Sequence, residues 1–83
     1  MKTHYKKLTQ PYFEYVRLGI KTFELRKNDC GYQNGDILVL QEYDSESGEY
    51  GMNEITTQIR CVLSDYTGLQ EGYVILGIEV LEK

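Results

Sequence analysis

The feature that most constrains the fold of this chain is a strict alternation of apolar and polar residues over residues 54–64. Successive side chains of a β-strand point to opposite faces, so the pattern predicts a strand with one buried face. The expected buried face consists of Ile55, Thr57, Ile59, Cys61 and Leu63. A strand of this kind needs a sheet and a core against which to pack.

Four further strands and one helix follow from the same reasoning. The strands are predicted at residues 3–8, 22–27, 37–40 and 73–81. The helix is predicted over residues 10–18, where Thr9 can cap, Pro11 is tolerated in the first turn and Gly19 ends the helix. Five strands and few helices favour a curled sheet that hides its edges. We therefore expect an α+β, mainly β fold: a small five-stranded curled β-barrel with one N-terminal α-helix, forming a single domain over residues 1–83.

Two segments break the regular pattern. Residues 44–53 are acidic and contain glycine, so they are expected to form a long, little-structured hairpin loop. Gly77 is on the face of the last strand that points away from its apolar residues, and it indicates a bulge or a close approach of another backbone.

The segment GIKTFELRKND, residues 19–29, combines a core strand with a polar site. Phe23 and Leu25 share one face of this strand and are expected to be its apolar pair, whereas Glu24 and Arg26 share the other face. Lys21 stands just before the strand, so a cation joins the carboxylate–guanidinium pair. The alternative is an ordinary solvated strand face with one surface ion pair, worth about 0–1 kcal/mol.

Charge is unevenly distributed along the chain, whose formal net charge is −4. Residues 1–27 contain seven Lys or Arg and two Glu, whereas the remainder contains two basic and eleven acidic residues. Such asymmetry suggests one cationic face on an acidic body, which would steer an anion to one place. A chance excess of cations on a solvated surface is the alternative.

The remaining composition excludes several classes of protein. One His and two separated Cys do not provide metal-ligand spacing, so neither a metal nor a cofactor is expected. Cys30 and Cys61 are expected to be reduced thiols, Cys61 in the core and Cys30 exposed in a loop. The longest apolar run is Ile37–Leu40, far too short to span a membrane. With no signal-peptide pattern at the start, a cytoplasmic location is expected.

The segment GIKTFELR, followed by NDCGYQNGD-ILVL, resembles the ASCH domain of the PUA-like superfamily. The signature of that domain is Gly-x-Lys-x-x-Glu-x-Arg before a loop and a Gly-Asp turn, and the flanks resemble a small uncharacterised bacterial and phage family within it. The matching positions are Gly19, Lys21, Glu24, Arg26, Gly35 and Asp36. The resemblance implies a PUA-like β-barrel with a cleft lined by the motif, and RNA or nucleotide binding has been proposed for the superfamily.

The resemblance also implies roles for individual residues. Lys21 and Arg26 would meet phosphate or base oxygens, Glu24 would accept from an exocyclic amine or orient Arg26, and His4 would lie near the same rim. This chain departs from relatives at Cys30, where they carry a basic residue, and its hairpin has no cation. Ligand binding is therefore expected from His4, Lys7, Lys21, Glu24, Arg26, Asn28 and Tyr73, with Tyr12, Tyr32 or Tyr73 available for base stacking.

Three functions are compatible with the sequence. The first is an RNA- or nucleotide-binding module, for which a short or single-nucleotide ligand fits the acidic remainder better than a long duplex. The second is a small amidohydrolase acting on modified nucleosides, because some ASCH-type proteins resemble such an enzyme. Lys21 matches its lysine and would be catalytic together with Glu24, although Glu24 occupies the position of its threonine. The third is an accessory domain whose acidic hairpin docks a protein through Glu46, Glu49 or Tyr50.

Overall fold

The computed structural model describes residues 1–82, so Lys83 lies outside the described part of the chain. Its elements, in chain order, are β1 (Thr3–Thr9), α1 (Tyr12–Arg17), β2 (Phe23–Lys27), β3 (Ile37–Asp44), β4 (Glu49–Leu63) and β5 (Tyr73–Glu82). The five strands form one sheet in the order β1-β3-β4-β5-β2. Among the strand pairs of residues 1–82, only β1–β3 is parallel. The predicted count of five strands and one N-terminal helix is confirmed.

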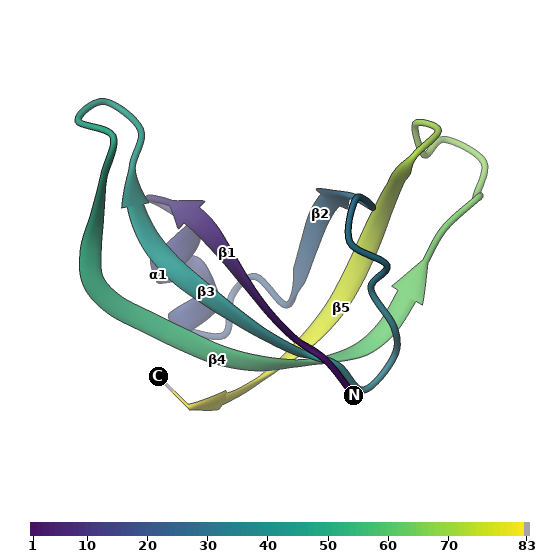
Figure 1. Cartoon of the computed structure of the whole chain (residues 1–83), viewed down its shortest axis with the longest axis horizontal. Helices are drawn as coiled ribbons and strands as arrows, with labels where there is room; N and C mark the ends of the chain where they lie inside the picture. The colour runs from purple at the N-terminus through teal and green to yellow at the C-terminus, as the bar shows by residue number, and fades with distance from the viewer. Residues whose placement is uncertain (83) are drawn as a thin grey trace.

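The sheet curls into an open half-barrel with two walls (Figure 1). We call β1, β3 and the first part of β4 the first wall, and β2, β5 and the last part of β4 the second wall. Strand β4 is long enough to run along the floor and into both walls, since it pairs with β3 at one end and β5 at the other. The predicted mainly β, curled architecture is thus confirmed, with β1 and β2 as the two edges of the sheet.

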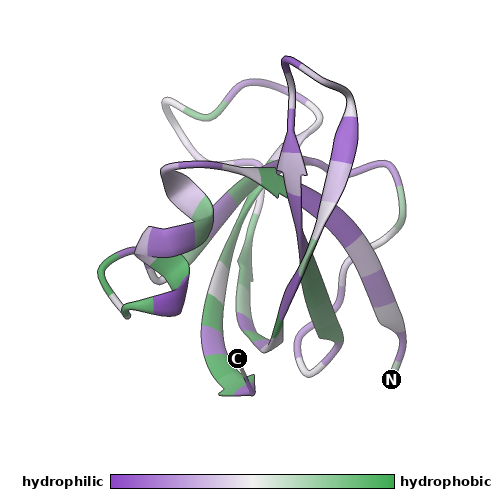
Figure 2. Cartoon of the chain, turned by 90° about the vertical axis from the view of Figure 1, so that its left-hand side faces the viewer, coloured by the Kyte–Doolittle hydropathy of each residue, from purple (hydrophilic) through white to green (hydrophobic). Residues whose placement is uncertain are grey.

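The core lies on the concave side of the sheet and is closed at the back by α1 (Figure 1). Apolar and polar residues alternate along the strands in Figure 2, as the period of two requires. Phe13 and Val16 insert from the helix among strand residues that include Leu38, Ile59 and Leu76. A six-residue helix is too short to be stable alone, so this packing is what holds it.

The helix is shorter than predicted at its start. Thr9 ends β1 instead of capping the helix, and Pro11 occupies the N-cap without a side-chain hydrogen bond. The side chain of Gln10 serves the first turn instead, because its Oε1 accepts a hydrogen bond from the backbone N of Glu14 at 3.1 Å.

A bulge in β4 corrects the prediction for the end of that strand. The pairing of β4 with β5 shifts between Ile59 and Cys61, and Cys61 lies opposite Gly77. Beyond the shift, Val62 packs against the core, whereas Cys61 and Leu63 are exposed. The expectation that Cys61 lies in the core was wrong because one extra residue reverses the faces of a strand. Gly77 marked the bulge as predicted.

The two free cysteines therefore exchange their expected environments. Cys30 is half-buried and packs against the core, although it was expected to be the exposed thiol. The hairpin was also predicted to be looser than it is. Strands β3 and β4 continue to Asp44 and from Glu49, so that only residues 45–48 form the turn.

The faces of β2 are the reverse of the expected ones. Phe23 and Leu25, predicted to be the apolar core pair, are 48% and 56% exposed. The side chain of Glu24 points into the half-barrel and is only 2% exposed. The alternative of a solvated ion pair on the strand surface is therefore also wrong, because the carboxylate is buried. The charged face of β2 is the inner face.

Candidate functional site

A cluster of three charged side chains occupies the inner face of β2. The Glu24 carboxylate accepts hydrogen bonds from the Lys21 ammonium and from Arg26, whose Nε lies 3.0 Å from Oε1 and Nη2 2.9 Å from it. The Lys21 Nζ also donates to the carbonyl oxygen of Phe23 at 2.7 Å. Strand register places Glu24 beside Leu76 and Arg26 beside Val74, which are both buried core residues. One carboxylate thus pairs with two cations at the margin of the apolar core.

Arg26 also connects the two edges of the sheet. Its Nη2 donates to the backbone carbonyl of Lys7 in β1 at 2.7 Å. A second link joins the Lys6 ammonium of β1 to Asp29, just after β2, at 3.7 Å. Strands β1 and β2 are not neighbours in the ladder, so these side chains join the two edges where backbone pairing is absent. The guanidinium is therefore both a strut between the walls and a charge facing the space between them.

The base of the half-barrel contains a second buried polar pair, between His4 and Asp36. The His4 Nε2 lies 2.8 Å from Asp36 Oδ2, and both side chains are less than one tenth exposed. Asp36 also accepts from the backbone N–H groups of Lys2 at 3.0 Å and Gln33 at 3.1 Å. Chiefly the Lys2 N–H, and then the hydrogen bond with His4, lower the pKa of Asp36 to about 2. The carboxylate therefore fixes the start of β1 against the turn that precedes β3.

Tyr32 packs beside this pair, with its ring centroid 4.8 Å from that of His4. The ring is buried, and its hydroxyl has no hydrogen-bond partner among residues 1–82. Burial is the main cause that raises the pKa of Tyr32, and the nearby Cys30 raises it further. The sequence marked Tyr32 as a stacking residue, but its buried position makes it part of the scaffold under the site.

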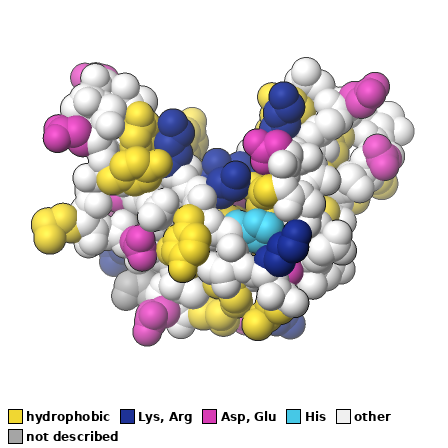
Figure 3. All heavy atoms as spheres, viewed as in Figure 1, with side chains coloured by type: hydrophobic (Ala, Val, Ile, Leu, Met, Phe, Trp, Pro, Cys, Tyr) yellow, Lys and Arg dark blue, Asp and Glu magenta, His cyan; other side chains and the backbone are white. Residues whose placement is uncertain are grey.

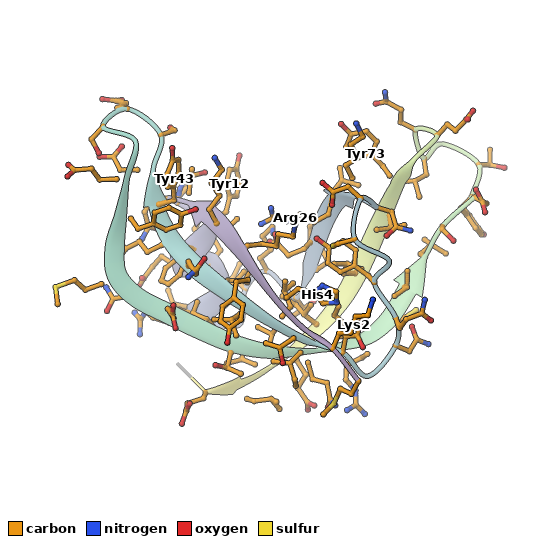
Figure 4. All side chains as sticks on the ribbon, viewed as in Figure 1. Lys2, His4, Tyr12, Arg26, Tyr43 and Tyr73 are labelled. Carbon is orange, nitrogen blue, oxygen red and sulfur yellow. The ribbon has the colours of Figure 1, made fainter. Side chains whose placement is uncertain are left out.

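The space between the walls forms a hollow in the surface (Figure 3). The cyan histidine lies at the base of this hollow, with dark blue atoms of Lys and Arg beside it. In Figure 4, Lys2 and His4 lie at the base, Arg26 lies between the walls, and tyrosines flank them, with Tyr12 and Tyr43 on one side and Tyr73 on the other. We call this region the cationic hollow. It unites residues from β1, α1, β2, β3 and β5.

The other residues singled out by the sequence lie around this hollow. Lys7 places its Nζ 4.4 Å from the centre of the Tyr43 ring, so it belongs to the first wall. Tyr73 is half-buried in the second wall, in register with Lys27. Asn28 follows β2 and accepts a hydrogen bond from the backbone N of Tyr32 at 3.3 Å. The structure thus brings Lys21, Glu24 and Arg26 together and arranges the remaining residues nearby.

Two cavities lie outside the Lys21–Glu24–Arg26 cluster. One, of about 590 Å³, adjoins the β3–β4 hairpin and is lined by Glu42, Tyr43, Asp44, Glu46, Glu49 and Tyr50 among others. The other, of about 430 Å³, is a shallow polar recess between the 28–34 loop and the end of β4. Lys21, Glu24 and Arg26 line neither of these two cavities and contact one another instead.

Some residues of the hollow were not predicted from the sequence. Asp36 was recognised only as part of the Gly-Asp turn, and its contact with His4 requires β1 to pair with β3. Lys2 and Lys6 were counted in the basic first third of the chain but were not assigned to the site. The alternation of His4, Lys6 and Leu8 along β1 was the available signal, since these residues share the inner face.

The described residues contain neither a group of three His, Cys, Asp or Glu side chains suited to a metal ion nor a helix able to cross a membrane.

Fold and site together define a small curled β-domain in which a buried carboxylate pairs with two cations beside a cationic hollow. More particularly, the chain belongs to the family described as a domain of unknown function, DUF3850, whose model matches residues 3–78. It is also similar to the uncharacterized 12.9 kDa protein in the GpA 3′ region of Escherichia phage P2, with 36% identity over 75 residues. That alignment covers 90% of this chain but 66% of the phage protein, so the chain spans just under two thirds of its relative.

Proposed function

We propose that this protein binds a nucleotide or a short single-stranded RNA in the cationic hollow. The observation that carries the proposal is the position of Arg26 and Lys2 between walls that present tyrosines on either side (Figure 4). Cations supply contacts to phosphate, and aromatic rings supply stacking surfaces for bases. The resemblance of the GIKTFELR segment to the ASCH domain supports the same proposal.

Arg26 is the group best placed to meet phosphate. Its Nε and Nη2 are fixed by Glu24 and Lys7, whereas its Nη1 has no hydrogen bond within residues 1–82. A guanidinium held in this way loses little conformational entropy when it binds an anion. Glu24 therefore positions Arg26 and also limits its attraction for anions by neutralising part of its charge. Lys21 contributes indirectly, because it bonds to the Glu24 carboxylate that holds Arg26.

Bases would stack on the exposed rings at the rim of the hollow. Tyr12, at the start of α1, is 50% exposed, and Tyr73 is half-buried in the second wall. Stacking on an aromatic ring contributes about 1–3 kcal/mol per base, which is substantial beside a few phosphate contacts. The acidic residues of the hairpin and of β4 disfavour a long polyanion. A ligand of one or a few nucleotides fits this distribution of charge best.

A salt titration tests the proposal. A labelled short single-stranded RNA should bind the protein at low salt, with an affinity that falls steeply as salt is raised. Lys2→Ala and Arg26→Ala should weaken binding, and each lost phosphate contact should reduce the slope of log affinity against log salt by about 0.7. Arg60→Ala is the matched control, because Arg60 is an exposed cation that is not among the residues assigned to the hollow. Its Nη1 lies 3.5 Å from Glu79 Oε1. Failure of the wild-type protein to bind nucleotides or RNA at low salt would refute the proposal.

The amidohydrolase alternative is less compatible with the geometry around Lys21. A lysine that acts as a base must present an uncharged amine. The Lys21 Nζ instead donates hydrogen bonds to the Glu24 carboxylate and to the Phe23 carbonyl, so the nitrogen is already held by two acceptors of the protein. Incubation with acylated nucleosides, comparing wild type with Lys21→Ala, tests this alternative. Equal turnover by the two proteins would exclude a catalytic role for Lys21.

A specific observation favours a second candidate function, the docking of a basic protein segment. The cavity of about 590 Å³ beside the hairpin combines the Tyr43 and Tyr50 rings, 5.0 Å apart, with the carboxylates of Glu46 and Glu49. Carboxylates and aromatic faces both attract Lys and Arg side chains. Binding of a basic peptide to the purified protein tests this function. Loss of binding in Glu46→Gln or Glu49→Gln, with binding retained in Arg26→Ala, would assign this surface to protein docking.

A further inference from the structure

We infer that the polar recess beside the hollow reads the base of the bound nucleotide and prefers guanine to adenine. The inference rests on the proposed nucleotide-binding function and adds the identity of the base. The recess is lined by Asn28, Tyr32, Gln33, Asn34, Val62 and Ser64. Its volume of about 430 Å³ is within the range of pockets that hold small ligands.

Two side-chain amides of the recess are held in one orientation by the backbone. The Asn28 Oδ1 accepts from the backbone N of Tyr32 at 3.3 Å, and the Asn34 Oδ1 accepts from the backbone N of Val62 at 2.9 Å. In each case the carbonyl oxygen is used by the protein itself. The two Nδ2 groups have no hydrogen bond within the described chain, residues 1–82. The fixed amides therefore offer donors to a ligand.

A site that presents two fixed donors selects a base edge with two neighbouring acceptors. Guanine carries such an edge, because its N7 and O6 are adjacent acceptors. Adenine places an amino donor beside N7, so it would set a donor against a donor. Gln33 and Ser64, which are exposed at the same recess, can donate or accept, so the preference rests on the two fixed amides.

Two contacts connect the recess to the hollow. Asn28 directly follows β2, and its backbone N donates to the carbonyl of Gly72, the residue before Tyr73. Tyr32 lines the recess and also packs on His4 at the base of the hollow. A ligand whose phosphate meets Arg26 therefore has a stacking ring and the recess on the same wall.

Binding of GMP and AMP to the purified protein tests this inference. Both are purines with one phosphate, so stacking and phosphate contacts are matched and their affinity ratio reports the base edge. We expect GMP to bind about tenfold more tightly than AMP, as for one good pair of base-specific hydrogen bonds. Asn34→Asp keeps the acceptor for the Val62 N–H but removes the donor, and it should bring the ratio close to one.

A matched control separates the lost donor from the added negative charge. Gln70→Glu adds the same charge in the turn before β5, outside the residues that line the recess, and should leave the ratio unchanged. Equal affinity for GMP and AMP, or an unchanged ratio in Asn34→Asp, would overturn this inference while leaving the proposed function intact. If neither nucleotide binds, the proposed function fails and the inference fails with it.

Discussion

The buried carboxylate of Glu24 offers the sharpest test of the site, through the variant Glu24→Gln. The substitution keeps the shape of the side chain but removes the negative charge that pairs with Lys21 and Arg26. Removing one partner of a buried ion pair costs about 3–5 kcal/mol, because the remaining charge is left uncompensated. The side chains of Lys21 and Arg26 are 15% and 20% exposed, so water relieves part of the penalty. We therefore expect a loss of about 3 kcal/mol.

A loss of that size is large for a chain of 83 residues. A domain of this length has a total unfolding free energy of about 4–12 kcal/mol. The melting temperature should fall by roughly 12–24 °C, taking about 4–8 °C per kcal/mol for a domain of this size. Urea unfolding followed by far-ultraviolet circular dichroism measures the change, with the linear extrapolation giving the free energy.

Glu79→Gln is the matched control for this experiment. It removes the same charge from an exposed pair with Arg60, in which both side chains are about 60% exposed. Such a pair contributes about 0–1 kcal/mol, so the control should unfold almost as the wild type does. If Glu24→Gln were no more destabilising than Glu79→Gln, the claim that a buried charge cluster joins the edges of the sheet would be refuted.

Three further predictions concern the scaffold of the hollow. The pKa of Asp36 is lowered from 3.8 to about 2 in the folded chain, so between these pH values the unfolded chain binds more protons than the folded chain. The free energy of unfolding should therefore decrease as pH falls through this interval. Urea titrations should show the unfolding free energies of wild type and Asp36→Asn converging toward the acid end of the interval. Phe13→Ala should cost about 3–5 kcal/mol in the same assay, because the ring is 2% exposed and anchors α1; a cost below about 1 kcal/mol would mean that the helix does not depend on it. Gly35→Ala should cost about 1–2 kcal/mol, because Gly35 has φ +92°. Nothing lies within 4 Å of an added Cβ, so the loss measures backbone strain alone. An unchanged unfolding midpoint would contradict this prediction.

Periodicity located the elements well but assigned the faces of two strands incorrectly. Alternation shows which residues share a face and leaves open which face points inward. In β2 the hydrophobic residues Phe23 and Leu25 suggested the inner face, yet Glu24 and Arg26 occupy it, where Arg26 bonds to Lys7 of β1 and Glu24 holds Arg26. That bridge depends on how the sheet curls, and the curl brings together segments that are distant in sequence.

The predicted buried face at the end of β4 was wrong for a local reason. The alternation of Ile59, Cys61 and Leu63 is unbroken in the sequence, but the bulge opposite Gly77 adds one residue and turns Cys61 and Leu63 outward. Gly77 was a correct signal for the bulge, but a glycine in one strand does not tell which residue of the partner strand is extra.

The candidate site was predicted in its members more fully than in its contacts. Grouping Lys21, Glu24 and Arg26 needed only their spacing around one short strand. Their use of one another as partners, and the pairing of His4 with Asp36, depended on strand neighbours that the sequence does not specify. The two Asn side chains of the recess illustrate the same limit, since the backbone groups that orient them lie in other parts of the chain or across a loop.

The order of strands in the sheet has a consequence for how the protein is made. Strand β2 pairs only with β5, and Phe23 lies opposite Gly77, so the strand that carries Glu24 and Arg26 leaves the ribosome long before its partner is synthesised. Pairing between segments so distant in sequence is slow, because a long loop must close first. A chain truncated before β5 would contain every residue of the charged cluster and would lack the strand that holds the cluster in place.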